Sequence, residues 1–389
     1  MKEYDIVIVG AGPAGSIAGL TLLRNGVNCL IIDECESPRF KLCGGLIMAK
    51  TLTDLKLQGF YNELNDLFAN SCKKVTIMKK NEYVADLECM EPMYLVHRPA
   101  LDEALLERYL KIGGEFIPEK VIEIDIENKE ILLNNNQKIS YNYLVGADGA
   151  NGITQTYVRK SGIQYARGCG INISKNKLQF DNDRVLMDFG LFHDGFLCEF
   201  PKDNSITIGC ICSRAKHNMI DLKKCFREVL ETRYQYKAEE NEIKEALVPY
   251  GWHCTELVNN KGNIILVGDA GGFSTCIPGD GIYNSILSGE VAATSIIHSK
   301  LSNEQATTIY QKLIQPQINY HNMVYNRIVV FYAWNDFFLR QIKRNKGAFA
   351  TFFYDTQIAY NTYNFSLIKI FFAWYRHKSK YYSRMLKSK

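Results

Sequence analysis

The chain has 389 residues, of which 47% are hydrophobic and 23% are charged, and its formal net charge at pH 7 is +4. This length predicts two or three structural units, and the composition excludes a largely disordered chain because enough apolar surface is present for a sizeable core. The small net charge argues against a general nucleic-acid-binding surface, so we expect no nucleic-acid partner.

The first feature along the chain is a strand followed by a glycine-rich turn. Residues 4–9 are a short β-branched run, which is typical of a buried parallel strand. The segment Gly10-Ala11-Gly12-Pro13-Ala14-Gly15 follows and leads into a helical pattern. In such a turn the first glycine bends the chain, the second lets the backbone approach a pyrophosphate, and the third lets the helix pack closely on the sheet. The N-terminus of the helix would donate N–H groups to the phosphates.

A second strand, residues 29–32, ends at the acidic pair Asp33 and Glu34. An acidic residue at this position accepts hydrogen bonds from ribose hydroxyls and disfavours a 2′-phosphate. Strand, turn, helix, strand and acid in this order predict a bound dinucleotide. The alternative is a strand-to-helix turn that binds nothing, and the motif by itself does not distinguish FAD from NAD.

Farther along, two apolar strands end in acidic turns. Residues 143–147 lead into Asp148 and Gly149, and residues 264–268 lead into Asp269. A carboxylate at the end of an apolar strand can accept a hydrogen bond from a sugar hydroxyl at a modest desolvation cost. Asp269 would alternatively cap the helix that follows.

A hairpin is predicted between these two strands. Residues 195–201 and 205–212 form two strand patterns joined by a short polar turn. Period-two alternation puts Phe196, Cys198 and Phe200 on one face, and Pro201 ends the strand. We expect these four residues to line an apolar substrate slot, and the alternative is a sheet face packed on its own core.

The last part of the chain, residues 301–389, is predicted to be helical and rich in aromatic side chains, among them Phe331, Tyr332, Trp334, Phe337, Phe338, Phe352, Phe353, Tyr354, Phe371, Phe372, Trp374 and Tyr375. After Asp355 no acidic residue occurs, whereas lysines and arginines continue to the end. A basic, aromatic segment suits a peripheral contact with an anionic membrane surface. The alternative is a helix packed on the core with a solvated basic tail.

These segments, and the order in which they follow one another along the chain, resemble those of FAD-dependent enzymes of the p-hydroxybenzoate-hydroxylase-like class. The resemblance implies that Asp269 binds the FAD ribose and that Asp148 and Gly149 lie near the pyrophosphate. It also implies a cofactor contact from Arg98, which precedes a Leu-Asp pair at the start of a helix. The loop that leads into a helix over 283–297 would place N–H donors beside the flavin ring, although its glycines can also serve the turn alone; the loop residues concerned are Gly279, Gly281 and Ile282.

Within that class, the segment Pro38-Arg39-Phe40-Lys41-Leu42-Cys43-Gly44-Gly45 is similar to the P-R-x-K-x-C-G-G signature of geranylgeranyl reductases. These enzymes saturate isoprenoid double bonds. The resemblance implies that Arg39, Gly44 and Gly45 contact the cofactor and that Cys43 supplies a thiol in the active site. The alternative for Cys43 is the usual one for a free cysteine, a small buried apolar side chain.

The hairpin departs from that family, which carries Y-x-W-x-F-P followed by G-x-G. Here Phe196 replaces the tyrosine, Cys198 replaces the tryptophan, and Gly209-Cys210-Ile211 replaces the two-glycine pattern. A cavity is therefore expected where the indole would stand, so the substrate need not be the usual lipid of the family. The same residues disfavour a flavin halogenase, which is expected to carry W-x-W-x-I-P and a catalytic lysine.

The expected fold is α/β, α+β overall: a doubly wound, Rossmann-type FAD-binding domain with an inserted antiparallel-sheet substrate domain and a helical C-terminal region. The FAD-binding domain is assigned to residues 1–70, 97–160 and 255–300. The substrate domain is assigned to 71–96 and 161–254, and the helical region to 301–389.

The expected function is reduction of carbon–carbon double bonds in a hydrophobic, isoprenoid-like substrate by hydride transfer from reduced FAD. Electrons would come from NAD(P)H or from a reduced carrier protein, since no second nucleotide fingerprint is present. Two alternatives stay open: an FAD-dependent monooxygenase that hydroxylates a small molecule, and a non-catalytic flavin-containing protein that binds lipid.

Twelve cysteines occur, and Met1 leads directly into a strand pattern. We therefore expect reduced thiols and a cytoplasmic location, with peripheral membrane association through the C-terminus as the alternative. We also expect a monomer. No Cys-x-x-Cys spacing or histidine cluster suggests a metal, and no stretch reaches the roughly 20 apolar residues of a membrane span.

Overall fold

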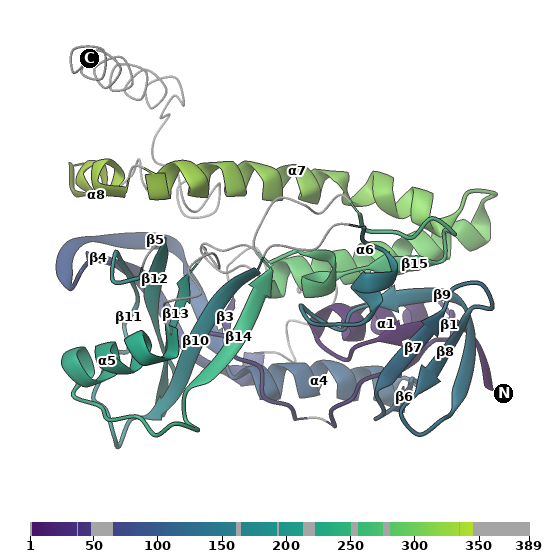
Figure 1. Cartoon of the computed structure of the whole chain (residues 1–389), viewed down its shortest axis with the longest axis horizontal. Coiled ribbons are helices and arrows are strands. Elements are labelled where there is room, and N and C mark those ends of the chain that lie inside the picture. The colour runs from purple at the N-terminus through teal and green to yellow at the C-terminus, as the bar shows by residue number, and fades with distance from the viewer. Residues whose placement is uncertain are drawn as a thin grey trace, which may run out of the picture.

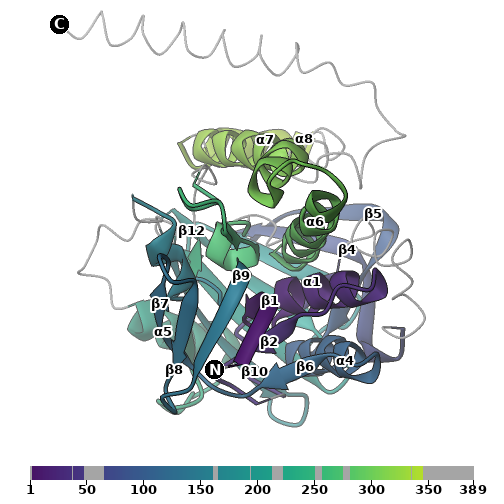
Figure 2. The same cartoon turned by 90° about the vertical axis from the view of Figure 1, so that its right-hand side faces the viewer.

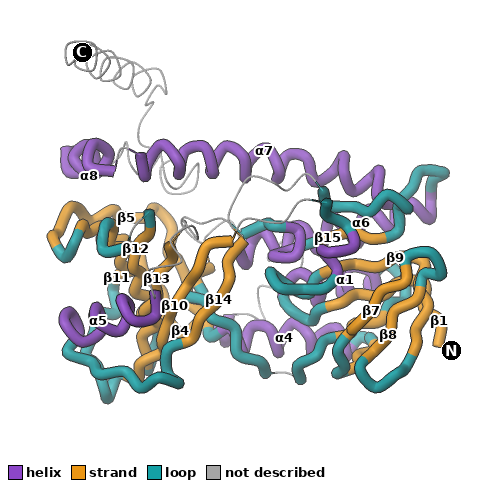
Figure 3. The backbone as a smooth tube through the Cα atoms, viewed as in Figure 1, coloured by secondary structure: helices purple, strands orange, loops and turns teal. Residues whose placement is uncertain are grey.

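The structure is a computed structural model that describes residues 2–36, 38–47, 65–160, 165–192, 194–212, 222–249, 256–274, 281–333 and 335–344. Two β-sheets stand side by side along the long axis of the molecule, and a long C-terminal helix runs over both (Figure 1). Coloured by secondary structure, the strands form two separate groups (Figure 3).

The first sheet has seven strands and is built around the N-terminal strand. Its parallel part contains, in spatial order, β6 (Glu115–Ile117), β2 (Leu30–Ile32), β1 (Lys2–Val9), β9 (Lys138–Gly146) and β15 (Ile264–Leu266). Parallel strands are buried on both faces, which explains their nearly unbroken apolar sequences. The expected α/β fold with a Rossmann-type sheet is confirmed.

Alternate residues of β1 pack against different layers. Ile6 and Ile8 point toward the helices, whereas Val7 and Val9 point to the opposite face. The helices on the first face are α1 (Pro13–Arg24), α4 (Arg98–Lys111) and α6 (Gly281–Leu301). The opposite face is covered by the antiparallel strands β7 (Val121–Asp125) and β8 (Glu130–Leu133). Each fully buried Val or Ile contributes on the order of 2 kcal/mol to folding.

The second sheet has eight strands. In spatial order they are β14 (Lys244–Pro249), β10 (Tyr165–Ser174), β13 (Ser205–Cys212), β12 (Gly195–Pro201), β11 (Arg184–Phe189), β4 (Phe68–Lys79), β5 (Glu82–Val96) and β3 (Leu46–Ile47). Its neighbours pair antiparallel except β11 and β4, which are parallel. The predicted hairpin is confirmed as β12 and β13, and α5 (Leu222–Tyr234) packs on one face of this sheet.

Strand β3 belongs to this second sheet, since it pairs with β5. Its residues lie within the range that the sequence assigned to the FAD-binding domain. The chain therefore leaves the first sheet soon after β2, contributes β3 to the second sheet, and returns with α4 only after β4 and β5. The short helix η1 (Asn65–Leu67) precedes β4.

Two C-terminal helices connect the two parts of the molecule. Helix α7 (Ala306–Ala333) packs along α6, and α8 (Asn335–Arg344) follows it (Figure 2). Phe338, Leu339 and Ile342 of α8 are buried against the second sheet. No helix in the described ranges has the length and apolar character needed to cross a bilayer. Trp334, the aromatic residues from Phe352 onward and the basic tail lie outside the described residues, as do the side chains of Phe331 and Tyr332.

Candidate functional site

The glycines of the N-terminal turn differ in what a side chain would meet. A Cβ at Gly10, where φ is +110°, would lie 2.2 Å from the carbonyl oxygen of Ala147, and a Cβ at Gly15 would lie 1.9 Å from that of Gly10. A Cβ at Gly12 would meet only the guanidinium end of Arg39, at 2.8 Å. Gly10 and Gly15 are therefore required by close backbone packing, whereas Gly12 leaves an open approach to the chain.

The N-terminus of α1 offers unused backbone donors at this turn. Helix α1 begins at Pro13, its N-cap Gly12 makes no side-chain capping hydrogen bond, and its first turn carries no acidic residue. The first N–H groups of a helix lack partners within the helix and carry a partial positive charge. Together with the open surface at Gly12, this arrangement fits the pyrophosphate of a dinucleotide.

Asp33 holds the turn in place. One carboxylate oxygen accepts hydrogen bonds from Ala11 N at 2.7 Å and from Arg39 at 2.6 Å, and the other accepts from Cys35 N at 3.0 Å. The side chain is 4% exposed. Asp33 therefore links the turn to the Arg39 segment, and its expected contact with a ribose stays a prediction. Glu34 is exposed and pairs with Lys120 at 2.7 Å.

Asp148 lies beside the same turn. A Cβ at Gly10 would come within 2.8 Å of its backbone nitrogen. Its carboxylate accepts hydrogen bonds from the backbone N–H and the hydroxyl of Thr154, at the start of the short helix η2 (Thr154–Tyr157). Burial raises the pKa of Asp148 to about 6, so its charge changes close to neutral pH. Gly149, with φ at +80°, adopts the left-handed backbone conformation of the turn that follows Asp148.

Asp269 forms an ion pair with Lys41 across a large distance in sequence. It follows β15, in the short helix η3 (Gly268–Gly271), and its carboxylate lies 2.9 Å from Lys41 Nζ. Burial works against the charged form, but the Lys41 ammonium, together with a smaller effect of Arg98, lowers the pKa of Asp269. This pair of Lys41 with Asp269 was not predicted from the sequence. The available signal was the position of Lys41 as the lysine of the P-R-x-K-x-C-G-G signature.

Arg98 is a buried cation between α4 and the Cys43 segment. It is 8% exposed and makes a two-pronged contact with Asp102, with N–O distances of 2.9 and 2.8 Å. Burial opposes the charge of Arg98, yet Asp102 and a hydrogen bond with Cys43 raise its pKa. Cys43 is half-buried and accepts a hydrogen bond from Gly45 N at 3.4 Å. Two segments that the sequence analysis predicts separately, the start of α4 and the C-G-G segment, thus meet at one thiol.

The Cys43 segment also lies against the second sheet. A Cβ at Gly44 would meet the ring of Phe200 at 2.5 Å, and a Cβ at Gly170 on β10 would meet the side chain of Leu42 at 2.6 Å. At Gly45, where φ is +74°, it would lie 2.0 Å from the carbonyl oxygen of Val96. This close packing places Cys43 at the junction of the two sheets.

Lys202 is a further charged group at this junction, in a position predicted from the sequence only as part of the polar turn of the hairpin. It is 3% exposed, and its Nζ donates a hydrogen bond to the hydroxyl of Thr207 at 2.6 Å. Burial lowers the pKa of Lys202 to about 8, and the nearby Cys43 opposes this decrease. The signal that could have found it is period-two alternation, which puts residue 202 on the same face as Phe200.

The four predicted wall residues divide into different environments. Phe196 and Cys198 are 3% and 7% exposed and pack in a cluster with residues of β4, β5 and α8. Of the two alternatives drawn from the sequence, this is the face packed on its own core. Phe200 is half-buried beside Gly44, and Pro201 points to the opposite face.

Helix α6 begins at Gly281 and Ile282, and Ile282 is 4% exposed. Helix α6 packs closely on the N-terminal glycine turn at Gly289, where a Cβ would lie 2.2 Å from the carbonyl oxygen of Ala14. Gly279 lies outside the described residues. Its predicted place beside the flavin stays a prediction.

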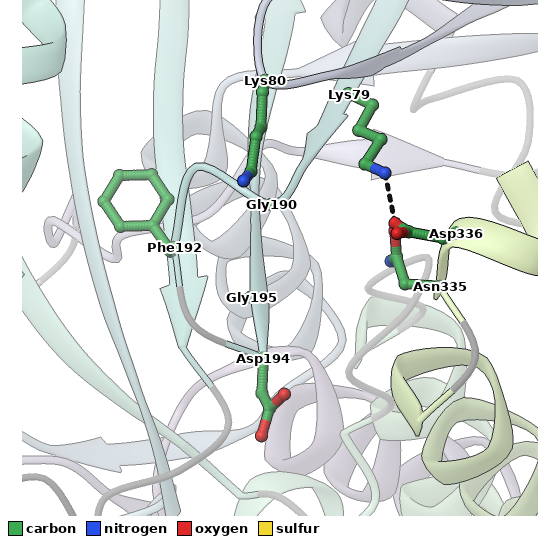
Figure 4. Close-up of a pocket in the computed structure, with 8 residues that line it drawn as sticks. All are labelled: Lys79, Lys80, Gly190, Phe192, Asp194, Gly195, Asn335 and Asp336. Carbon is green, nitrogen blue, oxygen red and sulfur yellow. Dashed lines mark hydrogen bonds and ion pairs between the residues drawn. The ribbon is translucent and has the colours of Figure 1, made fainter.

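A cavity of about 260 Å³ lies at the end of the second sheet that is opposite the Cys43 junction. Figure 4 shows the residues that line it. It is lined by the turn between β4 and β5, the loop before β12 and the start of α8, and Lys79 pairs there with Asp336. Its lining residues are Lys79, Lys80, Gly190, Phe192, Asp194, Gly195, Asn335 and Asp336. Because none belongs to the segments that surround the nucleotide turn or Cys43, this cavity is not the candidate cofactor site.

Comparison with known proteins gives a consistent result. Residues 3–286 match the family model described as FAD binding domain. An uncharacterized protein of Methanosarcina barkeri is 30% identical over 79% of this chain and 78% of its own length. The chloroplastic geranylgeranyl diphosphate reductase of Arabidopsis thaliana is 25% identical over 78% of this chain and 68% of its own length.

Solved structures share the fold. A geranylgeranyl bacteriochlorophyll reductase-like protein of Thermoplasma acidophilum superposes with a TM-score of 0.72 at 22% identity, over 86% of this chain and 87% of that one. The flavin-dependent brominase Bmp2 superposes with a TM-score of 0.73 at 15% identity, over 99% of this chain and 100% of that one. At these identities the likeness concerns the fold alone, and it is common to structures named for different reactions.

Proposed function

Because the chain belongs to the FAD-binding-domain family and is an FAD-dependent oxidoreductase related to geranylgeranyl reductases, we propose that it reduces carbon–carbon double bonds of a hydrophobic, isoprenoid-like substrate. The observation that carries this proposal is the junction at Cys43. There the C-G-G segment lies between the buried cation Arg98 and the ring of Phe200. The segment thus brings one thiol to the boundary between the nucleotide-binding sheet and the second sheet.

The residues present suit the cofactor in type and position. Gly12 and the first N–H groups of α1 would bind the pyrophosphate, and Asp269 would bind a sugar hydroxyl because its lowered pKa keeps it an acceptor. Arg98, Cys43 and Phe200 would surround the reacting end. In its reduced form, bound FAD would supply the two-electron chemistry of hydride transfer to an alkene. The protein orients the substrate and keeps bulk water away.

We further propose that the electrons come from NAD(P)H bound transiently or from a reduced carrier protein. The first sheet carries a single glycine fingerprint, which is the one at Gly10 to Gly15. A donor that only visits the site needs no second nucleotide-binding fold.

The decisive experiment uses the holoenzyme reduced anaerobically with dithionite. On addition of a geranylgeranylated lipid, the flavin absorbance is expected to return while mass spectrometry detects a product with two more hydrogens. If no alkene reoxidises the flavin but oxygen uptake is coupled to hydroxylation, a monooxygenase replaces the proposal. A flavin that dithionite and nicotinamide donors leave oxidised would indicate a non-catalytic lipid-binding protein.

Asp269→Asn is expected to weaken FAD binding by about 10-fold to 100-fold, because a hydrogen bond to a charged group contributes about 1.5–3 kcal/mol. The loss is measured by fluorescence titration of the apoprotein with FAD. Asp183→Asn is the matched control, since Asp183 is 59% exposed and pairs with Lys74 on the surface of the second sheet. Equal affinities of the two variants would contradict a role of Asp269 in holding the cofactor.

A further inference from the structure

Lys202 stands out among the buried charged groups because its hydrogen-bond partner is neutral. The Nζ donates to Thr207 Oγ1 at 2.6 Å, and that hydroxyl lies 3.0 Å from Asn172 Oδ1. Arg98, which is buried, and the partly buried Arg233 of α5 each contact a carboxylate at hydrogen-bonding distance. Burying an ammonium without such a partner is costly, so a lysine in this position needs a reason.

The direction of the Lys202 side chain follows from strand register. Phe200 of β12 is paired with Thr207 of β13, and Thr207 is paired with Asn172 of β10, so these side chains share one face of the sheet. Lys202 lies on the same face, two residues beyond Phe200. The segment that contains Leu42 and Gly44 covers that face. The ammonium therefore faces the Cys43 junction, away from α5.

The charged groups around Lys202 are few in the described part of the chain. Cys43 approaches it from the segment that covers the sheet, and Asp203 is its neighbour in sequence. Asp203 pairs with His97 at 3.1 Å. Because burial lowers the pKa of Lys202 to about 8, the ammonium is the main form at neutral pH and yet gives up a proton readily. A general acid works best when its pKa lies near the operating pH.

We propose that Lys202 is the proton donor of the reduction, with Thr207 as the residue that positions its ammonium. This inference rests on the proposed function. One N–H bond of the ammonium breaks and a C–H bond forms at one alkene carbon, while the other carbon receives the hydride from the reduced flavin. The carbon–carbon π bond is consumed, and the neutral amine left behind regains its proton from solvent after product release.

The kinetic test compares the wild type with Lys202→Met, Lys202→Arg and the control Lys74→Met, which removes a lysine paired with Asp183 on the protein surface. Each is purified with FAD, reduced anaerobically and mixed with the alkene, and flavin reoxidation is followed from pH 6 to 10. The wild-type rate is expected to fall as pH rises through about 8, because the ammonium form is the donor.

Lys202→Met is expected to react at least about 100-fold more slowly and to lose this inflection. Lys202→Arg keeps the positive charge but holds its proton, so it should be as slow as Lys202→Met. Lys74→Met should match the wild type.

Thr207→Val keeps the lysine and removes the acceptor of its hydrogen bond. Since that bond favours the charged form, the inflection should move to lower pH. A readout that does not depend on turnover is the NMR titration of lysine labelled with carbon-13 at Cε in the oxidised holoenzyme. One resonance should titrate near pH 8 in the wild type and be missing in Lys202→Met.

A normal rate and pH profile in a folded, FAD-loaded Lys202→Met would overturn the inference and leave the proposed function standing. Full activity of Lys202→Arg would overturn it as well, because a fixed charge would then suffice. A wild type that reduces no alkene would remove both the proposed function and the inference.

Discussion

Gly12→Ala is expected to fold normally and to lose FAD affinity by at least about 100-fold, which corresponds to roughly 2.8 kcal/mol. Within the chain, the new Cβ would meet only the end of the Arg39 side chain, at 2.8 Å, and that side chain is 27% exposed and has room to move. A pyrophosphate at the N-terminus of α1 must instead approach the backbone at Gly12 closely, and a methyl group keeps it away. The result would be a stable apoprotein without the yellow cofactor.

The measurement combines a thermal melt of the apoprotein with a flavin titration. Gly168→Ala is the matched control, because a Cβ there would be at least 3.5 Å from its neighbours in the second sheet. Gly15→Ala provides the contrast, since a Cβ 1.9 Å from a carbonyl oxygen should impair folding itself. A Gly12→Ala protein that purifies with a full complement of FAD would disprove the assignment of this turn.

The second large effect is on stability. Arg233→Met is expected to lower the free energy of unfolding by about 3–5 kcal/mol, because it leaves buried carboxylates without their cation. Arg233 of α5 lies 2.6 Å from Asp188, whose side chain is 0% exposed, and 3.2 Å from Glu199 on β12. Burial raises the pKa of Asp188 in spite of the arginine. Removal of the guanidinium would expose the full cost of that burial.

Urea denaturation measures this loss. Lys177→Met is the control, because Lys177 is exposed and its surface pair with Glu242 should contribute little to stability. Adding Asp188→Asn to Arg233→Met should restore part of the lost stability, since the uncompensated charge is then gone. If the Arg233→Met and Lys177→Met variants were equally stable, the ion pairs of Arg233 with Asp188 and Glu199 would contribute no more to stability than a surface pair.

Local patterns sufficed for the elements around the N-terminal glycine turn. The strand at residues 4–9, the glycine turn and the helix after it are where the sequence predicted them, because their requirements are carried by neighbouring residues. The hairpin of β12 and β13 was equally accessible, since alternation and a polar turn specify it within eighteen residues, from Gly195 to Cys212. The C-G-G segment was found by resemblance alone.

The charged partners at the site were not accessible in this way. Lys41 and Asp269 are 228 positions apart, and nothing near either residue encodes the other. From the sequence, Lys202 is predicted only as part of a turn, and its burial becomes apparent only when β12, β13 and the Cys43 segment enclose it. Likewise, Phe196 and Cys198 alternate as a substrate wall would, yet α8 and β5 cover them.

By itself, the sequence determined the nucleotide-binding turn, the class of the fold and the family, because each depends on backbone requirements and periodicities that neighbouring residues express. Only the tertiary structure decided which charges meet, which elements cover each face of the second sheet, and that β7 and β8 cover the second face of the parallel sheet. The physical reason is that burial and ion pairing depend on contacts between distant segments. Such contacts change the pKa of a side chain without leaving a pattern along the chain.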